Sequence, residues 1–193
     1  PNGRSDGWDS GECVAVWEIA ARYDGQMDEL GIILRVGYTH AELEFDNDAP
    51  VFYRDVNGNG AFNVAVDDVI ATLDDREAWN AGIDLNWGAF GLGAAYTEDD
   101  NGVSGDALES ETWVVGLDYT TGPFKLGASY YSQDQALSDA ELETDRWTGG
   151  VVYTYGPGMT FRGSLSYVEH EVPGVDTGDA EATSLLFGTQ INF

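Results

Sequence analysis

The chain has 193 residues, of which 35 are acidic and only 8 are lysine or arginine, so its formal net charge at pH 7 is −27. This excess of acid argues against nucleic acid as a partner and favours surfaces that attract cations. The single cysteine, Cys13, excludes an internal disulfide. The mean hydropathy is −0.27, and no stretch approaches the ~18 apolar residues that a membrane-spanning helix needs. A β-barrel stays open as a membrane fold, because only every second residue of its strands meets lipid.

Taken in chain order, nine stretches alternate between apolar and polar residues, which predicts nine β-strands. Each stretch keeps its apolar residues on one parity, and residues of the opposite parity are mostly small or polar. The apolar sets, which we expect to face outward, span residues 15–23, 32–38, 79–87, 90–96, 113–119, 124–130, 147–155, 161–167 and 185–193.

Aromatic residues stand at both ends of most of these sets. Trp79 and Trp87 are eight positions apart, which corresponds to a height of roughly 20 Å for a strand that rises ~3.3 Å per residue and tilts by ~40°. Aromatic girdles flank an apolar band of about this height in membrane barrels. A soluble sandwich would instead concentrate its large residues in the middle of each strand.

The connections between the expected strands alternate between short and long. Residues 88–89, 120–123 and 155–158 indicate tight turns, whereas 42–76, 98–110, 133–144 and 169–181 are long, acidic and rich in glycine. Outer-membrane barrels have short periplasmic turns and longer external loops. We therefore expect residues 24–30 on the periplasmic side and residues 1–10 outside.

These features predict an all-β fold, a transmembrane antiparallel up-and-down β-barrel with a single domain over residues 1–193. Single-chain bacterial barrels have even strand numbers, whereas nine is odd. We therefore expect N-terminal strands to be missing, so that this chain is the C-terminal part of a barrel of about 16 strands.

With the apolar parity outward, the charged side chains on the strands face the lumen: Glu18, Arg22, Arg35, Asp84, Asp118, Lys125, Arg146 and Arg162. They are the candidate pore-lining residues, since walls of charge tune which ions pass. Simple solvation of a wet interior is the alternative for each of them. The basic wall favours anions and the acidic loops favour cations, so the sequence leaves the selectivity open.

The longest loop contains a candidate calcium site. Oxygen side chains at the first, third and fifth positions of Asp55-Val56-Asn57-Gly58-Asn59-Gly60, with glycine at the sixth, match the turn of an EF-hand-type loop, and the stretch resembles the calcium loop of dockerin modules. We expect structural Ca²⁺ to be ligated by Asp55, Asn57, Asn59, the carbonyl of Ala61, and Asp67 or Asp68. The twelfth position is Val66, so a plain Asn-Gly turn is the alternative.

No catalytic constellation is apparent. The only histidines, His40 and His170, have no serine or cysteine at a recognisable spacing, and a nucleophile needs an oriented base. We interpret both as exposed loop residues and Cys13 as a small apolar residue, and we predict that the protein is not an enzyme.

The hairpins 111–119 with 122–130, the stretch 153–160 and the end 186–193 resemble the Gram-negative general porins, in particular the alphaproteobacterial type. The resemblance covers residues 77–193 well and the first 76 poorly. It implies a channel for passive diffusion of small hydrophilic solutes and ions, an outer-membrane location, contact with lipid and lipopolysaccharide, and a homotrimer. It also marks Phe187, Ile191 and Phe193 as a C-terminal assembly signal.

Two other functions fit parts of the sequence. Residues 15–23 resemble a strand of phosphate-selective porins, which would imply an anion pathway. A soluble, acidic, calcium-binding β-sandwich that acts as a surface or adhesion module is the alternative from another class.

Overall fold

The computed structural model describes residues 13–43, 51–54, 68–104, 108–137, 140–171 and 179–191. Its strands are β1 (Cys13–Met27), β2 (Leu30–Leu43), β3 (Val51–Arg54), β4 (Asp68–Thr72), β5 (Arg76–Trp87), β6 (Phe90–Asp99), β7 (Ser110–Thr121), β8 (Phe124–Leu137), β9 (Ala140–Gly156), β10 (Met159–Glu171) and β11 (Ala180–Ile191). Among the described residues, no helix is long and apolar enough to cross a membrane.

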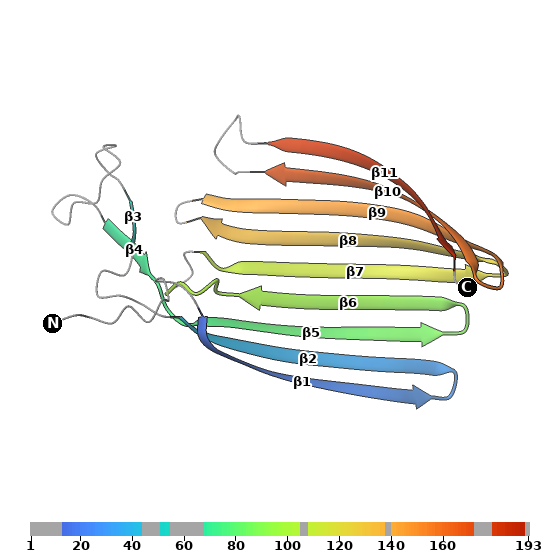
Figure 1. Ribbon diagram of the computed structural model, residues 1–193, viewed down its shortest axis with the longest axis horizontal. Coiled ribbons are helices and arrows are strands. Elements are labelled where there is room, and N and C mark those ends of the chain that lie inside the picture. The colour runs from blue at the N-terminus through green and yellow to red at the C-terminus, as the bar shows by residue number, and fades with distance from the viewer. Residues whose placement is uncertain are drawn as a thin grey trace.

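Nine strands form one antiparallel sheet in the order β1-β2-β5-β6-β7-β8-β9-β10-β11, and β3 pairs with β4 in a separate two-stranded sheet (Figure 1). Each strand of the large sheet therefore pairs with its neighbour in sequence, apart from the inserted β3 and β4. This confirms the predicted all-β, up-and-down arrangement of nine strands. The large sheet is open, with β1 and β11 as its edges.

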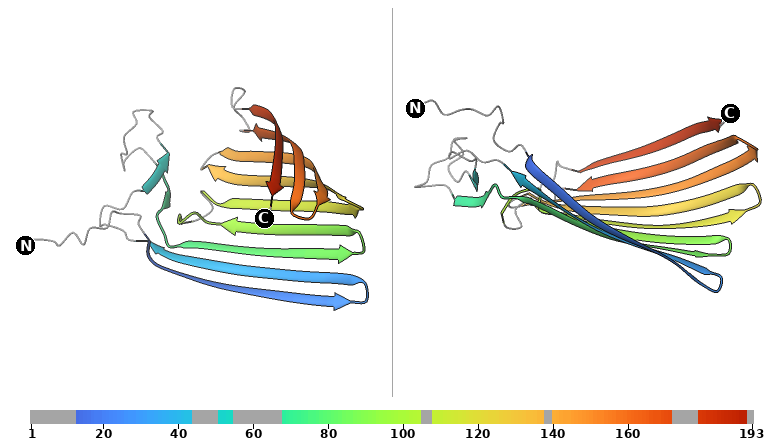
Figure 2. Two further views of the ribbon diagram at one scale, coloured as in Figure 1. Left: turned by 45° about the vertical axis from the view of Figure 1, so that its right-hand side comes forward. Right: turned by 60° about the horizontal axis from the view of Figure 1, so that its bottom comes forward.

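The large sheet is strongly curved. Figure 2 shows β10 and β11 curling over the face of the middle strands, which makes one face concave. The short turns gather at one end of the strands, together with the end of β11, and the strand ends that the longer connections join gather at the other (Figure 1). We call these the turn end and the loop end.

Two of the tight turns depend on glycine. Gly88 joins β5 to β6 with φ at 57°, and Gly122 joins β7 to β8 with φ at 54°. Both values lie in the left-handed region, which two-residue hairpin turns of the primed types require and which glycine adopts without a steric penalty. These turns fix the register of the flanking strands.

The sheet is a single layer with hardly any buried side chains. Among the described residues, the buried hydrophobic side chains are Ala41 and Val103, which are 4% and 3% exposed. Both belong to the loop end, where Leu73 also forms a β-bridge with Val103. A soluble sandwich would have a packed core between two sheets, so this architecture gives the sandwich alternative no support.

The boundaries differ from the sequence prediction in three places. The expected loop 133–144 is wrong, because β8 and β9 continue to Leu137 and from Ala140. The segment 24–30 is largely strand, with only residues 28–29 between β1 and β2. The expected loop 42–76 contains the hairpin of β3 and β4. Each strand extends beyond its apolar set because polar residues continue the ladder outside the alternating region.

Candidate functional site

The pairing register keeps the predicted outward residues together on one face, which we call the apolar face. Two rows of ring contacts border it. At the loop end, centroids lie 4.4 Å apart in the pairs Tyr96–Trp113 and Tyr130–Trp147. At the turn end, centroids lie 4.8 Å apart in the pairs Phe90–Tyr119 and Phe124–Tyr153. Between the rows, Leu117 and Leu165 are 60% and 54% exposed, so this face needs an apolar environment.

The concave face carries the opposite parity and most of the predicted pore-lining charges. A hollow of about 850 Å³ lies on it, and its charged lining residues are Arg35, Asp84, Asp118, Lys125 and Arg162. The remaining predicted residues, Glu18, Arg22 and Arg146, share this parity in the register of the sheet. The strand pattern thus brings all eight to one face, and the hollow brings five of them together.

Most cations of this face are paired with carboxylates. The guanidinium of Arg35 donates to the carboxylate of Asp84 across the β2–β5 pair. The Lys125 Nζ lies 3.1 Å from Asp118 Oδ1.

A third pair lies within one strand. The Nη2 of Arg22 is 2.7 Å from Asp24 Oδ1, and the side chains of both residues are more than half exposed. Exposed pairs of this kind contribute only about 0–1 kcal/mol to stability. Their main consequence is local cancellation of charge.

Arg146 and Arg162 differ from these paired cations. Neither has a carboxylate at ion-pair distance among the described residues. The Arg146 guanidinium lies 5.7 Å from the centroid of the Tyr131 ring. Arg162 Nη2 donates to Gln190 Oε1 at 2.6 Å, and its register partners are Val152 and Gly188.

Glycines opposite the acids let the charged side chains lie along the wall. Gly91 faces Asp118 across the β6–β7 pair, and a Cβ at position 91 would lie 2.5 Å from Asp118 Oδ2. Gly93 faces Asp84, where an added Cβ would lie 3.2 Å from Asp84 Oδ1. A side chain at either position would crowd the carboxylate and force it to shift.

The loop end carries a row of acids on the apolar parity, beyond the aromatic rings. We call Glu98, Glu111, Asp134, Glu143 and Glu171 the acidic row, because each is the direct cross-strand partner of the next. Like charges directly opposite one another in a sheet are destabilising. The row therefore depends on water and salt for screening.

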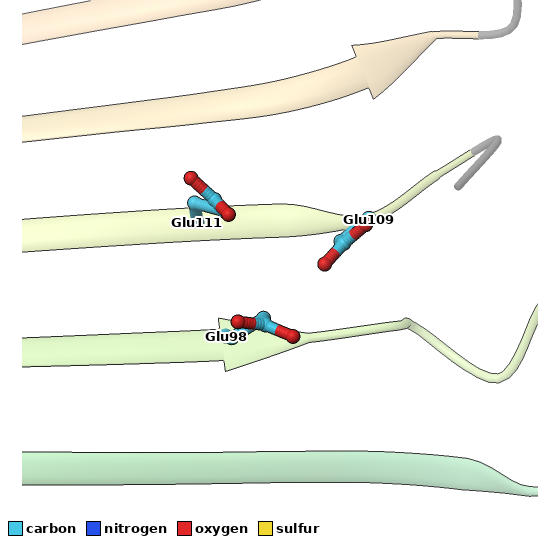
Figure 3. Close-up of side chains that lie close together, drawn as sticks. All are labelled: Glu98, Glu109 and Glu111. Carbon is cyan, nitrogen blue, oxygen red and sulfur yellow. The ribbon is translucent and has the colours of Figure 1, made fainter.

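Three carboxylates lie particularly close together at this end. Figure 3 shows Glu98, Glu109 and Glu111, and one oxygen of each lies within 4.8 Å of the others. The Tyr96 hydroxyl donates to Glu98 at 2.8 Å and to Glu111 at 3.1 Å. This cluster was not among the residues predicted from the sequence. Their position in the sequence could have indicated it, because Glu98 and Glu111 each stand two residues beyond an aromatic residue of the girdle.

Two carboxyls of the acidic row have raised pKa values. Both lie beyond the aromatic rings and thus outside the part of the strands between the girdles. Burial, together with repulsion by Glu111 and Asp145, raises the pKa of Asp134 above its usual range. Burial and then repulsion by Asp134 do the same for the pKa of Glu143. The ionised form of these two carboxyls is therefore less favourable in the row than it is for a free carboxylate in water.

Both histidines lie in strands, so the prediction that they are exposed loop residues is wrong. His40 lies in β2 with its ring 5.3 Å from that of Trp17, and its side chain is 17% exposed. His170 lies in β10, where its Nδ1 is 2.8 Å from Thr144 Oγ1.

Several predicted site residues fall outside the described ranges. Of the expected calcium ligands, only Asp68 lies within them, at the start of β4, and the others fall between β3 and β4. The calcium site stays a prediction. Of the C-terminal signal, Phe187 and Ile191 are 75% and 53% exposed in β11, and Phe193 lies outside the described residues.

The family model described as Gram-negative porin matches residues 15–172, which is most of the chain. The chain belongs to the Gram-negative porin family. This confirms the resemblance seen in the sequence, and membership places the porin in the outer membrane of a Gram-negative bacterium. Among curated proteins, none matches the sequence.

Solved structures share the fold of this porin at low sequence identity. The anion-selective porin from Comamonas acidovorans has a TM-score of 0.56 and 15% identity, with 94% of this chain and 50% of that chain covered. The outer-membrane-expressed OmpT of Vibrio cholerae has a TM-score of 0.54 and 14% identity, with 90% of this chain and 56% of that chain covered. An in-vitro folded trimer form of Vibrio cholerae OmpT has a TM-score of 0.50 and 17% sequence identity. The porin thus spans about half the length of these proteins.

Proposed function

We propose that this porin forms the wall of a water-filled channel through which small hydrophilic solutes and ions diffuse passively across the outer membrane. The observation that supports this best is the division of the sheet into two faces. The apolar face is bordered by two rows of aromatic rings, and the concave face is polar and charged. Lipid suits the first face and water suits the second.

Conduction follows from this division if the wall closes around the concave face. Closure satisfies every backbone group by strand pairing, which hydrocarbon demands. A lumen wide enough for water needs about 16 strands. Structures with the same fold and about twice the length support a wall of that size. The extent of the whole wall belongs to this proposal.

The partners are part of the same proposal. We expect lipid and lipopolysaccharide against the apolar face, because its exposed leucines and aromatic rings have no protein cover among the described residues. We also expect a homotrimer, which the trimer form of the Vibrio cholerae OmpT structure supports. We propose no catalytic step, and the porin family match supports a channel.

Planar-bilayer recording tests the proposal directly. The protein is extracted from outer membranes in detergent and added to a planar bilayer in KCl. Stepwise openings of nanosiemens size, grouped in threes, are the expected result. A bilayer that stays silent, with a protein that remains monodisperse without detergent, would contradict the channel.

A further inference from the structure

We propose that Arg162 is the residue through which the hollow on the concave face attracts anions, while the other cations of the hollow are neutralised by their partners. This inference rests on the proposed channel function. It concerns which residue sets the ion preference of the turn-end half of the wall.

The charge of the hollow points to a single excess cation. Its charged lining residues are three cations, Arg35, Lys125 and Arg162, and two carboxylates, Asp84 and Asp118. The formal charge is therefore +1, in a chain whose total is −27. Arg35 contacts Asp84 and Lys125 contacts Asp118, which leaves Arg162.

The register explains why Arg162 stays without a carboxylate. Its direct partners on either side are Val152 of β9 and Gly188 of β11. The residues two positions from these on the same face are Gly150, Thr154, Leu186 and Gln190, none of which is charged. The only side-chain hydrogen bond of Arg162 among the described residues goes to the neutral Gln190. Its guanidinium is exposed to the hollow and keeps further N–H donors available.

A paired and an unpaired charge act differently on a passing ion. The field of an ion pair falls off as that of a dipole, whereas the field of a lone charge persists to the screening length of ~10 Å at 0.1 M salt. A unit charge about 6 Å away in water changes the local concentration of a monovalent ion about threefold. Arg162 should therefore enrich small anions such as chloride beside β10, and the paired residues should do so much less.

Val152 lies between the paired Lys125 and the unpaired Arg162. It is the direct partner of both Lys125 in β8 and Arg162 in β10, so the two cations stand on either side of it, roughly 10 Å apart at the backbone for two strand spacings. A carboxylate at position 152 would face Arg162 directly and cancel its field.

The test measures the reversal potential of single channels in a KCl gradient, with chloride and potassium as the probe ions. Arg162→Gln should lower the chloride-to-potassium permeability ratio about threefold, and Arg162→Lys should keep it. The matched control is the double variant Asp118→Asn with Lys125→Gln, which removes a pair without changing the net charge. It should leave the ratio close to that of the unmodified porin. Val152→Asp provides an independent route and should lower the ratio as Arg162→Gln does.

Open channels whose ratio is unchanged in both Arg162→Gln and Val152→Asp would overturn the inference while leaving the channel function intact. The same conclusion would follow if the double variant moved the ratio as far as Arg162→Gln does. A silent bilayer with the unmodified protein would instead overturn the channel function itself. Heat-modifiable mobility on gels checks that each variant has folded.

Discussion

The concave face and the acidic row arrange charge in opposite ways within one sheet. On the concave face, Arg35 and Asp84 contact each other across strands, and so do Lys125 and Asp118. In the acidic row, each member has a direct cross-strand partner of the same sign. The comparison shows that alternation alone does not decide the charge environment of a strand residue. The contacts that its side chain makes on the neighbouring strands, direct or diagonal, decide it.

The difference follows the surroundings of each region. Exposed pairs on the concave face contribute little stability, but they cancel charge along a surface that ions would pass. The acidic row lies beyond the aromatic rings, where water and salt screen the repulsion. Both regions therefore fit a wall whose middle meets lipid and whose loop end meets water.

The largest expected effect comes from placing a charge on the apolar face. Ala128→Arg puts a guanidinium among the outward residues between Leu117 and Gly149. We expect it to lower the free energy of unfolding by about 2–4 kcal/mol, the cost of arginine near the bilayer midplane. Urea titration of the porin refolded in lipid vesicles measures it. The matched control, Ser129→Arg, points to the concave face and should cost much less, and an equal loss in the two variants would contradict the assignment of faces.

A smaller effect should follow from separating one ion pair of the concave face. Asp118→Asn replaces the carboxylate beside Lys125 Nζ with a neutral amide, so the ammonium loses the charge that neutralises it. The freed ammonium should raise the chloride-to-potassium permeability ratio, by up to about threefold for one added lone charge.

Reversal potentials in a KCl gradient measure this shift. The double variant Asp118→Asn with Lys125→Gln is the control, because it removes the same carboxylate together with its cation and leaves the net charge unchanged. A permeability ratio that stays the same in Asp118→Asn, with channels that open normally, would show that Asp118 does not neutralise Lys125.

The smallest effect concerns the acidic row. The pKa of Asp134 is raised in the folded state, so the folded protein binds more protons than the unfolded chain between that raised value and the ordinary value near 3.8. Stability should therefore rise as the pH falls through this window. Asp134→Asn should remove part of the rise and stabilise the porin near neutral pH by about 0.2–1 kcal/mol per relieved pair.

Thermal unfolding in detergent as a function of pH measures this change. Ser132→Ala, a neutral substitution two residues along β8 on the same face, should leave the pH dependence unchanged. If Asp134→Asn had the same pH profile as the unmodified porin, repulsion within the row would be ruled out as its cause.

The sequence by itself determined the features that depend on a period of two. The apolar sets, the aromatic ends and the turns at 88–89 and 122–123 are local, because a residue's parity fixes its face and a glycine fixes its turn. The placement of Arg35, Asp84, Asp118, Lys125 and Arg162 on one face followed from the same rule. The resemblance to the porin family also followed from the sequence, because the hairpins of that family repeat this alternation.

Only the tertiary structure decided which charges meet. Arg35 and Asp84 are 49 positions apart, and their contact depends on the register of β2 against β5. The isolation of Arg162 depends on its pairing with Val152 of β9 and Gly188 of β11. The like-charged partners of Asp134 depend on the pairing of β8 with β7 and β9. Strand ends were also decided there, since β8 and β9 pair through polar residues that show no alternation. A cross-strand partner is a non-local property, so the pattern within one strand cannot specify it.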